Sequence, residues 1–440
     1  MPDMREWGVF PGRPAARFPI ELPSPMRLLS LLLAAILAGT AADARAQAIP
    51  AAKAPPAAAK HRFLPDEPRS EPRPIRSRHF SFLSDVSDRE AKEILERLER
   101  MTALLEKYFG RRLPGVIEGF IVHDLAVWPE GVLVEPLGVE KIREPAGVCF
   151  TTVLGPHRRA TLYSCDDPRI IQHECTHGFC HLVFGGVGPP WLAEGLAEMG
   201  RWWEEREKET EVDPVVWAIL RDPRLPRPGI HDIVAPETRP AEPRDYVWRW
   251  ALCHLLVENP NFADRFRTLA VALMEGRPGA SFETAFAPVG REVAFEFDRF
   301  LADAANGYRT DLAAWPWKAK HKRLAPRGSA RAKVKAAAGW QSSGVEVTAG
   351  ETFVIEAEGS WRVATGGDTV GPAGSADGSG RLVGALFADF TLSGEFPLGP
   401  RADLVAPADG VLMLRCGDAW TGLSDNDGTL TVTIRRKEAP

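Results

Sequence analysis

The segment His173-Glu174-Cys175-Thr176-His177 holds the residues of this chain best suited to chemistry. Two histidines four positions apart share one face of an α-helix, so both imidazoles can reach one metal ion. Glu174 lies about 100° round the helix, where its carboxylate can hold a water bound to that ion. The chain has ten histidines, and a chance match is on the order of one in a hundred. We therefore expect a Zn²⁺ site with Glu174 as general base; ordinary solvated or core histidines are the alternative.

A catalytic zinc ion commonly has three protein ligands and an open fourth position, so a third ligand is expected. His181 lies on the same helix face, but the helix rise puts its Cα about 12 Å from that of His173, too far to share an ion. We expect it in packing or beside a ligand. Glu194 is the better candidate, because it comes 17 positions after His177, beyond a Gly/Pro turn that lets two helices pack antiparallel.

The helix that must carry the two histidines is marked at both ends. Asp167 can cap it, Pro168 suits its first position, and Gly185-Gly186 end it. Apolar spacing predicts another helix before it and several after it, and short apolar runs predict a small sheet. The expected helices are 88–109, 191 to about 208, 246–258, 262–275 and 291–305, and the expected strands 116–122, 148–153 and 160–163.

Composition and patterning divide the 440 residues into several parts, and 45% hydrophobic with 26% charged residues is typical of folded protein. Beyond residue 335, short apolar runs separated by Gly, Asp and Pro indicate an all-β sandwich. A net charge of −5 gives no reason to expect a nucleic-acid partner. The expected parts are 1–46 leader and signal peptide, 47–78 Pro/Ala-rich flexible tether, 79–317 catalytic domain, 318–334 basic linker and 335–440 β-sandwich.

The N-terminal region has the pattern of a secretory signal peptide. Met26-Arg27 precede the apolar run 28–37, and Ala44-Arg45-Ala46 form a small-x-small site, so cleavage is expected after Ala46. The run is too short for a spanning helix, so a transmembrane segment is the weaker interpretation. We expect a secreted or periplasmic protein without stable membrane insertion. There a bond between Cys149 and Cys165 becomes an option, whereas Cys175 and Cys180 face apart on one helix.

The segment Pro190-Trp191-Leu192-Ala193-Glu194-Gly195-Leu196-Ala197-Glu198 resembles the Trp-Leu-x-Glu-Gly-x-Ala motif of gluzincin peptidases, the clan of thermolysin and aminopeptidase N. The resemblance covers residues 79–315 and implies an α+β fold, with a small sheet, the HExxH helix and a helical lower half. It implies that Glu194 is the third zinc ligand. Glu198 is then either an acceptor for a ligand histidine or a surface charge.

In the aminopeptidase N branch a tyrosine that opens a later helix stabilises the oxyanion, and the segment 245–251 is similar to that helix start. The resemblance implies this role for Tyr246; plain helix packing is the alternative, and His231 is another candidate donor. Aminopeptidases of the clan also carry a Gly-x-Met-Glu-Asn strand whose Glu binds the substrate amine. Gly147-Val148-Cys149-Phe150 lacks that Glu, which favours an endopeptidase or another specificity.

Residues 335–437 resemble the PA-I type galactophilic lectin domain, a calcium-dependent β-sandwich, in stretches such as Gly359-Ser360-Trp361 and Asp425-Asn426-Asp427-Gly428. The resemblance implies a Ca²⁺ site, and ordinary turn chemistry is the alternative. The implied calcium ligands are the side chains of Asp418, Asp425 and Asn426 and the carbonyls of Ala364 and Gly422. The family's sugar-contacting residues fall at Gly378 and Arg381, which cannot reproduce those hydrogen bonds.

Together these features predict a multidomain secreted zinc metallopeptidase that acts on peptide or protein substrates. The β-sandwich would direct it to glycans or a cell surface. The rival interpretation is a non-catalytic binding or scaffold protein with a degenerate peptidase domain. Glu174 favours the enzyme, because a structural zinc site has no use for a general base and prefers four protein ligands.

Overall fold

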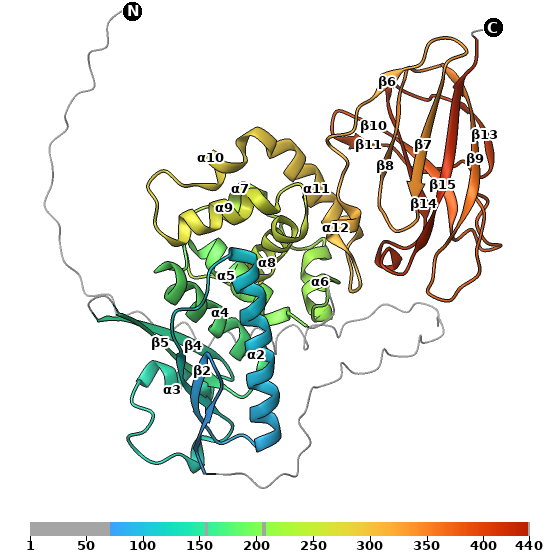
Figure 1. The fold of residues 1–440 in the computed structure, drawn as a ribbon. Coiled ribbons are helices and arrows are strands. Elements are labelled where there is room, and N and C mark those ends of the chain that lie inside the picture. The colour runs from blue at the N-terminus through green and yellow to red at the C-terminus, as the bar shows by residue number, and fades with distance from the viewer. Residues whose placement is uncertain (1–70, 155–156, 205–207, 439–440) are drawn as a thin grey trace, which may run out of the picture. The chain divides into compact units, whose positions relative to one another are not determined.

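A computed structural model describes residues 71–154, 157–204 and 208–438, all within the compact unit formed by residues 63–440. A mixed α/β region comes first and a β-rich region follows (Figure 1). The expected signal peptide, its cleavage site after Ala46 and most of the expected tether lie outside the described residues. Within the described ranges, none of the helices is both long and apolar enough to cross a bilayer.

The α/β region contains one five-stranded sheet in the order β1-β2-β3-β5-β4. The three central strands are parallel, and β1 and β4 are antiparallel edge strands. The predicted tether is wrong at its end, because Ile75 in β1 is buried in the core and Arg73 donates to the Val86 carbonyl at 2.7 Å. The strands are β1 (Arg73–Arg76), β2 (Phe80–Ser84), β3 (Ile117–Val122), β4 (Gly147–Leu154) and β5 (His157–Cys165).

The five expected helices are present as α2, α5, α8, α9 and α11, and the histidine-bearing helix is α4. α5 ends at Trp202 rather than near residue 208, because the carbonyl of Trp203 turns away to accept hydrogen bonds from Arg97 and Gln172. The helices are α2 (Asp88–Phe109), α3 (Pro136–Arg143), α4 (Pro168–Phe184), α5 (Pro190–Trp202), α6 (Pro214–Arg221), α7 (Ile230–Val234), α8 (Pro243–Glu258), α9 (Ala263–Met274), α10 (Phe282–Phe286), α11 (Gly290–Asp303) and α12 (Thr310–Ala313).

The Cys149–Cys165 bond that the sequence left as an option is not formed. In the antiparallel β4/β5 pair Cys149 lies opposite Leu162, three positions from Cys165. Three strand positions span about 10 Å, which exceeds the Cα separation that a disulfide tolerates. All six cysteines are free, including Cys175 and Cys180, which are both buried in α4.

The β-rich region has two sheets whose inner side chains form one core. Val334, Ile355 and Val432 from one sheet pack with Leu382 and Leu412 from the other. The sheet orders are β11-β10-β14-β8-β6, with β12 beside β10, and β13-β9-β15-β7. The strands are β6 (Lys322–Arg323), β7 (Ser329–Lys335), β8 (Gln341–Val347), β9 (Thr352–Arg362), β10 (Arg381–Ala388), β11 (Thr391–Leu392), β12 (Phe396–Pro397), β13 (Arg401–Val405), β14 (Gly410–Gly417) and β15 (Asp427–Arg436).

The predicted basic linker 318–334 is wrong, since most of it belongs to this region. In β7 the side chains of Ala332 and Val334 point into the core, while Arg331, Lys333 and Lys335, which alternate with them, are exposed. The charges that suggested a linker are the outward half of an alternating strand.

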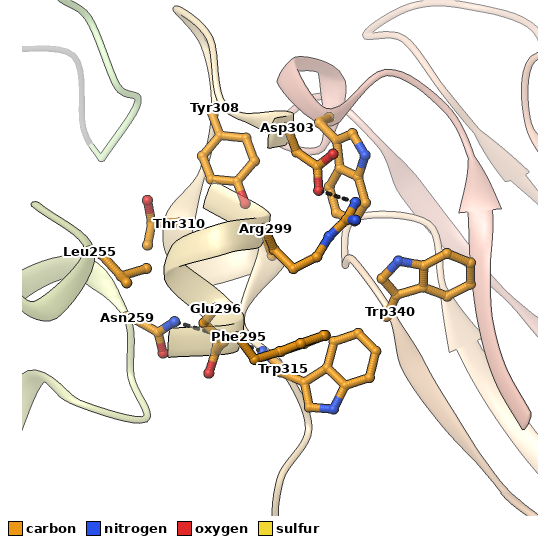
Figure 2. A pocket seen from close by; sticks show the side chains of 12 residues that line it. Leu255, Asn259, Phe295, Glu296, Arg299, Asp303, Tyr308, Thr310, Trp315 and Trp340 are labelled. Carbon is orange, nitrogen blue, oxygen red and sulfur yellow. Dashed lines mark hydrogen bonds and ion pairs between the residues drawn. The ribbon is translucent and has the colours of Figure 1, made fainter. Parts of the chain in front are cut away.

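The segment that connects the two regions, around Trp315 and Trp317, is hydrogen-bonded to a buried carboxylate. Glu296 in α11 is 5% exposed and accepts hydrogen bonds from Asn259 Nδ2 (2.6 Å), Asn261 Nδ2 (2.9 Å), Trp315 N (3.0 Å) and Trp317 Nε1 (2.6 Å). Burial raises the pKa of Glu296, and these donors oppose that shift. Figure 2 shows Glu296 with Asn259 and Trp315 at one end of a small cavity of ≈ 20 Å³. A cavity of this size can hold one water molecule.

Replacing Glu296 by Gln is expected to lower the free energy of unfolding by about 1.5 kcal/mol, because the amide group cannot accept all four hydrogen bonds. Urea denaturation followed by tryptophan fluorescence measures the change. Glu292→Gln, a partly exposed position on the same helix, is the matched control and should change little. Equal denaturation midpoints for the two variants would show that the carboxylate adds no net stability.

Candidate metal centre

The helix α4 begins and ends as the sequence predicts. The Asp167 side chain accepts a hydrogen bond from the Arg169 backbone N–H at 2.8 Å, and Pro168 occupies the first helical turn. Gly185 ends the helix in the left-handed conformation with φ of 92°. One regular helix therefore places His173 and His177 on the same face, with Nε2 atoms 3.2 Å apart.

Glu194 in α5 meets both histidines. Its Oε2 lies 3.4 Å from His173 Nε2 and 3.5 Å from His177 Nε2. One ligand atom from each of the three residues lies within 4.8 Å of the others, and the described residues contain no second His/Cys/Asp/Glu cluster of this kind. His173 is buried and the other two are half-buried. Two imidazoles and one carboxylate are the ligand set that zinc takes in hydrolytic sites, so these residues fit zinc.

Two glycines let α5 pack closely on its neighbours, Gly200 on α4 and Gly195 on α8. A Cβ on Gly200 would lie 2.1 Å from Thr176 Oγ1 in α4, and one on Gly195 would lie 2.3 Å from Cys253 Sγ in α8. Gln172, next to His173, ties the same two helices together through its hydrogen bond to the Gly200 carbonyl at 2.8 Å. Helix-interior glycines were the sequence signal for this contact, because such positions otherwise disfavour glycine.

Glu198 stands one turn after Glu194 and is only 6% exposed, so the surface-charge interpretation is wrong. Its Oε1 lies 3.1 Å from His173 Nδ1, at ion-pair distance but without hydrogen-bond alignment. Its Oε2 accepts a hydrogen bond from Trp202 Nε1 at 3.0 Å. The carboxylate thus lies beside the ring nitrogen of His173 that faces away from the cluster, the position where a metal-binding histidine commonly meets a carboxylate.

The charges of these residues are strongly coupled. Burial lowers the pKa of His173, but the carboxylates of Glu194 and Glu198 outweigh burial and raise it to about 10. Burial raises the pKa of Glu194, and the two histidines reverse this and bring it well below its usual range. Without a metal ion, protons therefore balance the carboxylates. A divalent cation can replace these protons, so its binding should release them.

Glu174 lies where α4 passes the edge strand β4. Its Cγ would be 2.8 Å from a Cβ on Gly147, so the glycine leaves room for the glutamate side chain. One edge of β4 pairs with β5. Among the described residues no strand pairs with its other edge, so β4 ends the sheet. Glu174 and an edge strand that could pair with an extended peptide are thus neighbours.

The two candidate oxyanion donors differ in position. Burial, and next the charge of Glu194, raise the pKa of Tyr246 to about 12, so its hydroxyl stays protonated within electrostatic reach of the cluster. The side chain of His231 is 83% exposed and lies 3.9 Å from Glu283. The charge of Glu194 therefore acts on Tyr246, whereas His231 is an exposed side chain beside Glu283. His181 is half-buried, which lowers its pKa, and it is outside the ligand cluster.

The residues of the expected calcium site are partly brought together. A Cβ on Gly422 would lie 3.0 Å from Asp418 Oδ2 and 3.7 Å from Asp425 Oδ1, so both carboxylates converge on this loop. Asp418 Oδ2 and Asn426 Oδ1 are buried, and neither has a hydrogen-bond partner in the described chain. The Ala364 carbonyl accepts a hydrogen bond from Gly367 at 3.0 Å in its own turn. Unpartnered oxygens fit a hard cation such as calcium.

Comparison with known proteins gives little. No family model and no curated protein matches the chain. Among solved structures, one described as the EclA N-terminal domain, a PllA-like lectin, is similar to part of the chain with 24% identity. The match covers 24% of this chain and 96% of that one, with a TM-score of 0.22. At that TM-score the likeness carries no argument about fold or function.

Glu198→Gln is expected to weaken zinc binding about tenfold, because the neutral amide no longer supports the outer nitrogen of His173. Competition with a chromophoric chelator measures the affinity. Glu204→Gln, just after the end of α5, is the control and should bind zinc normally. If both variants bind zinc as tightly as wild type, Glu198 does not support the ligand.

Proposed function

We propose that the α/β region is a zinc-dependent peptidase. The observation that carries this proposal is the convergence of His173 and His177 from α4 with Glu194 from α5, with ligand atoms within 4.8 Å, beside Glu174 of α4. Zinc held there would supply Lewis acidity and lower the pKa of a bound water toward about 7. The gluzincin assignment rests on the motif resemblance and is part of this proposal.

Two side chains near the zinc ligands then have separate chemical roles. Glu174 accepts a proton from the attacking water and delivers it to the leaving amine. Tyr246, kept protonated by its surroundings, donates a hydrogen bond to the oxyanion that forms at the scissile carbonyl. An extended substrate adds to the free edge of β4, which passes beside Glu174. Because strand addition uses backbone groups on both sides of the scissile bond, this geometry favours endopeptidase action.

A non-catalytic scaffold is the competing function. A structural zinc site normally has four protein ligands, whereas the cluster among the described residues has three. Glu174 lies next to that cluster and is no ligand, which favours catalysis. The β-rich region would serve either function as a targeting module for glycans or a cell surface, in an exported protein.

Metal removal and restoration test the peptidase proposal. The purified chain should contain about one zinc per molecule by mass spectrometry and should cleave casein or a peptide library. Dialysis against 1,10-phenanthroline should abolish cleavage, and added zinc should restore it. A chain that binds zinc but cleaves no member of the library would favour the scaffold function.

We also propose that the loop 418–426 binds calcium, because it leaves buried carboxylate and amide oxygens without partners. Calcium at ten times its dissociation constant is then expected to add about 1.4 kcal/mol to the free energy of unfolding of the β-rich region. Thermal unfolding with calcium or with EGTA measures this gain. Asp418→Asn should lose most of it, while Asp409→Asn, in a distant turn, should keep it. A wild type indifferent to calcium would support ordinary turn chemistry.

Galactose binding by the family's mode is not part of the proposal. The positions of the sugar-contacting residues hold Gly378, which has no side chain, and Arg381, whose Nε donates to the Ala373 carbonyl at 3.3 Å. A glycan array therefore suits this region better than a galactose assay.

A further inference from the structure

Arg249 is a buried cation near the metal centre that the proposed mechanism leaves without a role. It lies in α8, three positions after Tyr246, and is 7% exposed. Its backbone carbonyl would be 2.9 Å from a Cβ on Gly195, the residue next to Glu194. The turn of α8 that carries Arg249 thus packs directly on the turn of α5 that carries the third candidate ligand.

Two contacts fix the guanidinium. Its Nη2 donates to Glu237 Oε1 at 2.6 Å, in the segment before α8. Its central carbon lies 5.8 Å from the ring centroid of Tyr246, within the range of a cation–π contact. The remaining Nη1 is buried and has no hydrogen-bond partner in the described chain. The Tyr246 ring is therefore one of the groups that contact the guanidinium, and the guanidinium restrains the ring in return.

The start of α8 is fixed by a separate set of polar contacts. Arg239 donates two hydrogen bonds to Asp245, at 2.8 and 2.9 Å, and Asp245 accepts the backbone N–H of Glu242 at 2.7 Å. These contacts hold the backbone that carries Tyr246. They do not involve its ring, and among the described residues the charged side chain recorded over that ring is Arg249.

The surroundings of the Tyr246 hydroxyl are otherwise acidic. Burial raises the pKa of Tyr246 most. The charges of Glu194, Glu237 and Glu198 also raise it, and the charge of Arg249 lowers it. A donor to an oxyanion works best when its orientation is fixed and positive charge lies nearby. Arg249 meets both requirements.

We propose that Arg249 is the positioning residue for Tyr246, holding the phenol ring so that its hydroxyl can donate to the oxyanion. This inference rests on the proposed peptidase function. Arg249 acts through Tyr246 and touches neither substrate nor metal, so its removal should slow the chemical step without weakening substrate or zinc binding.

A double-mutant cycle tests the inference in the full chain. Arg249→Met is expected to lower kcat about tenfold, with KM and zinc content within about twofold of wild type. Arg249→Lys, which keeps the charge over the ring, should recover most of the loss. In a Tyr246→Phe background, Arg249→Met should have almost no further effect, because the hydroxyl it positions is gone.

A binding measurement gives a readout other than activity. Calorimetry should show that a peptide phosphonamidate, whose phosphoryl oxygen mimics the oxyanion, binds about tenfold more weakly to Arg249→Met and to Tyr246→Phe, with no further loss in the double variant. If Arg249→Met does not fold, Arg249→Gln, which keeps a donor toward Glu237 without the charge, completes the cycle.

The possible outcomes separate the two proposals. Multiplicative effects of the two substitutions, a change in KM alone, or loss of zinc from a folded Arg249→Met variant would overturn the role of Arg249 and leave the peptidase function intact. A wild type that holds zinc but neither cleaves peptides nor binds the phosphonamidate would overturn both.

Discussion

Glu174→Gln is expected to reduce peptide hydrolysis by a factor on the order of 10² to 10⁴ while zinc stays bound. Glutamine has nearly the shape of glutamate, so it should fit the space that Gly147 leaves beside α4. Its amide cannot accept a proton from water or pass one to the leaving amine. Because Glu174 is not among the three converging side chains, its replacement removes no metal ligand.

The measurements are zinc content by mass spectrometry and kcat/KM on a fluorogenic peptide from the wild-type cleavage profile. His181→Gln is the matched control on the same helix. His181 lies outside the ligand cluster, so this variant should keep both zinc and activity within about threefold. A Glu174→Gln variant that cleaves at the wild-type rate would exclude Glu174 as the base. Loss of zinc from the His181 variant would mean that the ligand set is wrong.

The parts of the structure that the sequence predicted best are those marked by local chemistry. Asp167, Pro168 and Gly185 each fix one end of α4 through a cap or a backbone preference that acts within a few residues. The helical period predicted the extent of α2, and Gly110 ends that helix in the left-handed conformation. Once α4 was known to be regular, the common face of its two histidines followed from helix geometry alone.

Features that depend on contacts between distant segments were harder to predict from the sequence. The charges of β7 looked like a linker, because their alternation with Ala332 and Val334 is visible as a strand only when a second sheet covers the inner face. For Glu198, the spacing could not distinguish a surface charge from a group beside His173. That distinction depends on how closely α4 and α5 approach, which Gly200 and the Gln172 hydrogen bonds determine.

This close approach leads to the second large effect. Gly200→Ala is expected to weaken zinc binding about 100-fold and to lower the free energy of unfolding by about 3 kcal/mol, the upper end for overpacking a core contact. The added methyl group would lie 2.1 Å from Thr176 Oγ1, far inside van der Waals contact. α5 must then move away from α4, and Glu194 moves with it. Chelator competition and urea denaturation measure the two quantities.

Thr176→Ala in the same chain provides the decisive control. The threonine hydroxyl bonds only within its own helix, to the Gln172 carbonyl at 2.8 Å, apart from a weak contact with Met101 Sδ at 3.9 Å. Its removal alone should therefore cost about 1 kcal/mol and leave zinc binding intact. With the hydroxyl gone, the nearest atom to the new methyl is the residue 176 Cβ at 3.2 Å, which a small helix shift relieves. Thr176→Ala/Gly200→Ala should thus regain most of the zinc affinity that Gly200→Ala loses. Failure of this rescue, with Gly200→Ala still deficient, would mean that the glycine matters for α5 itself and not for its distance from α4.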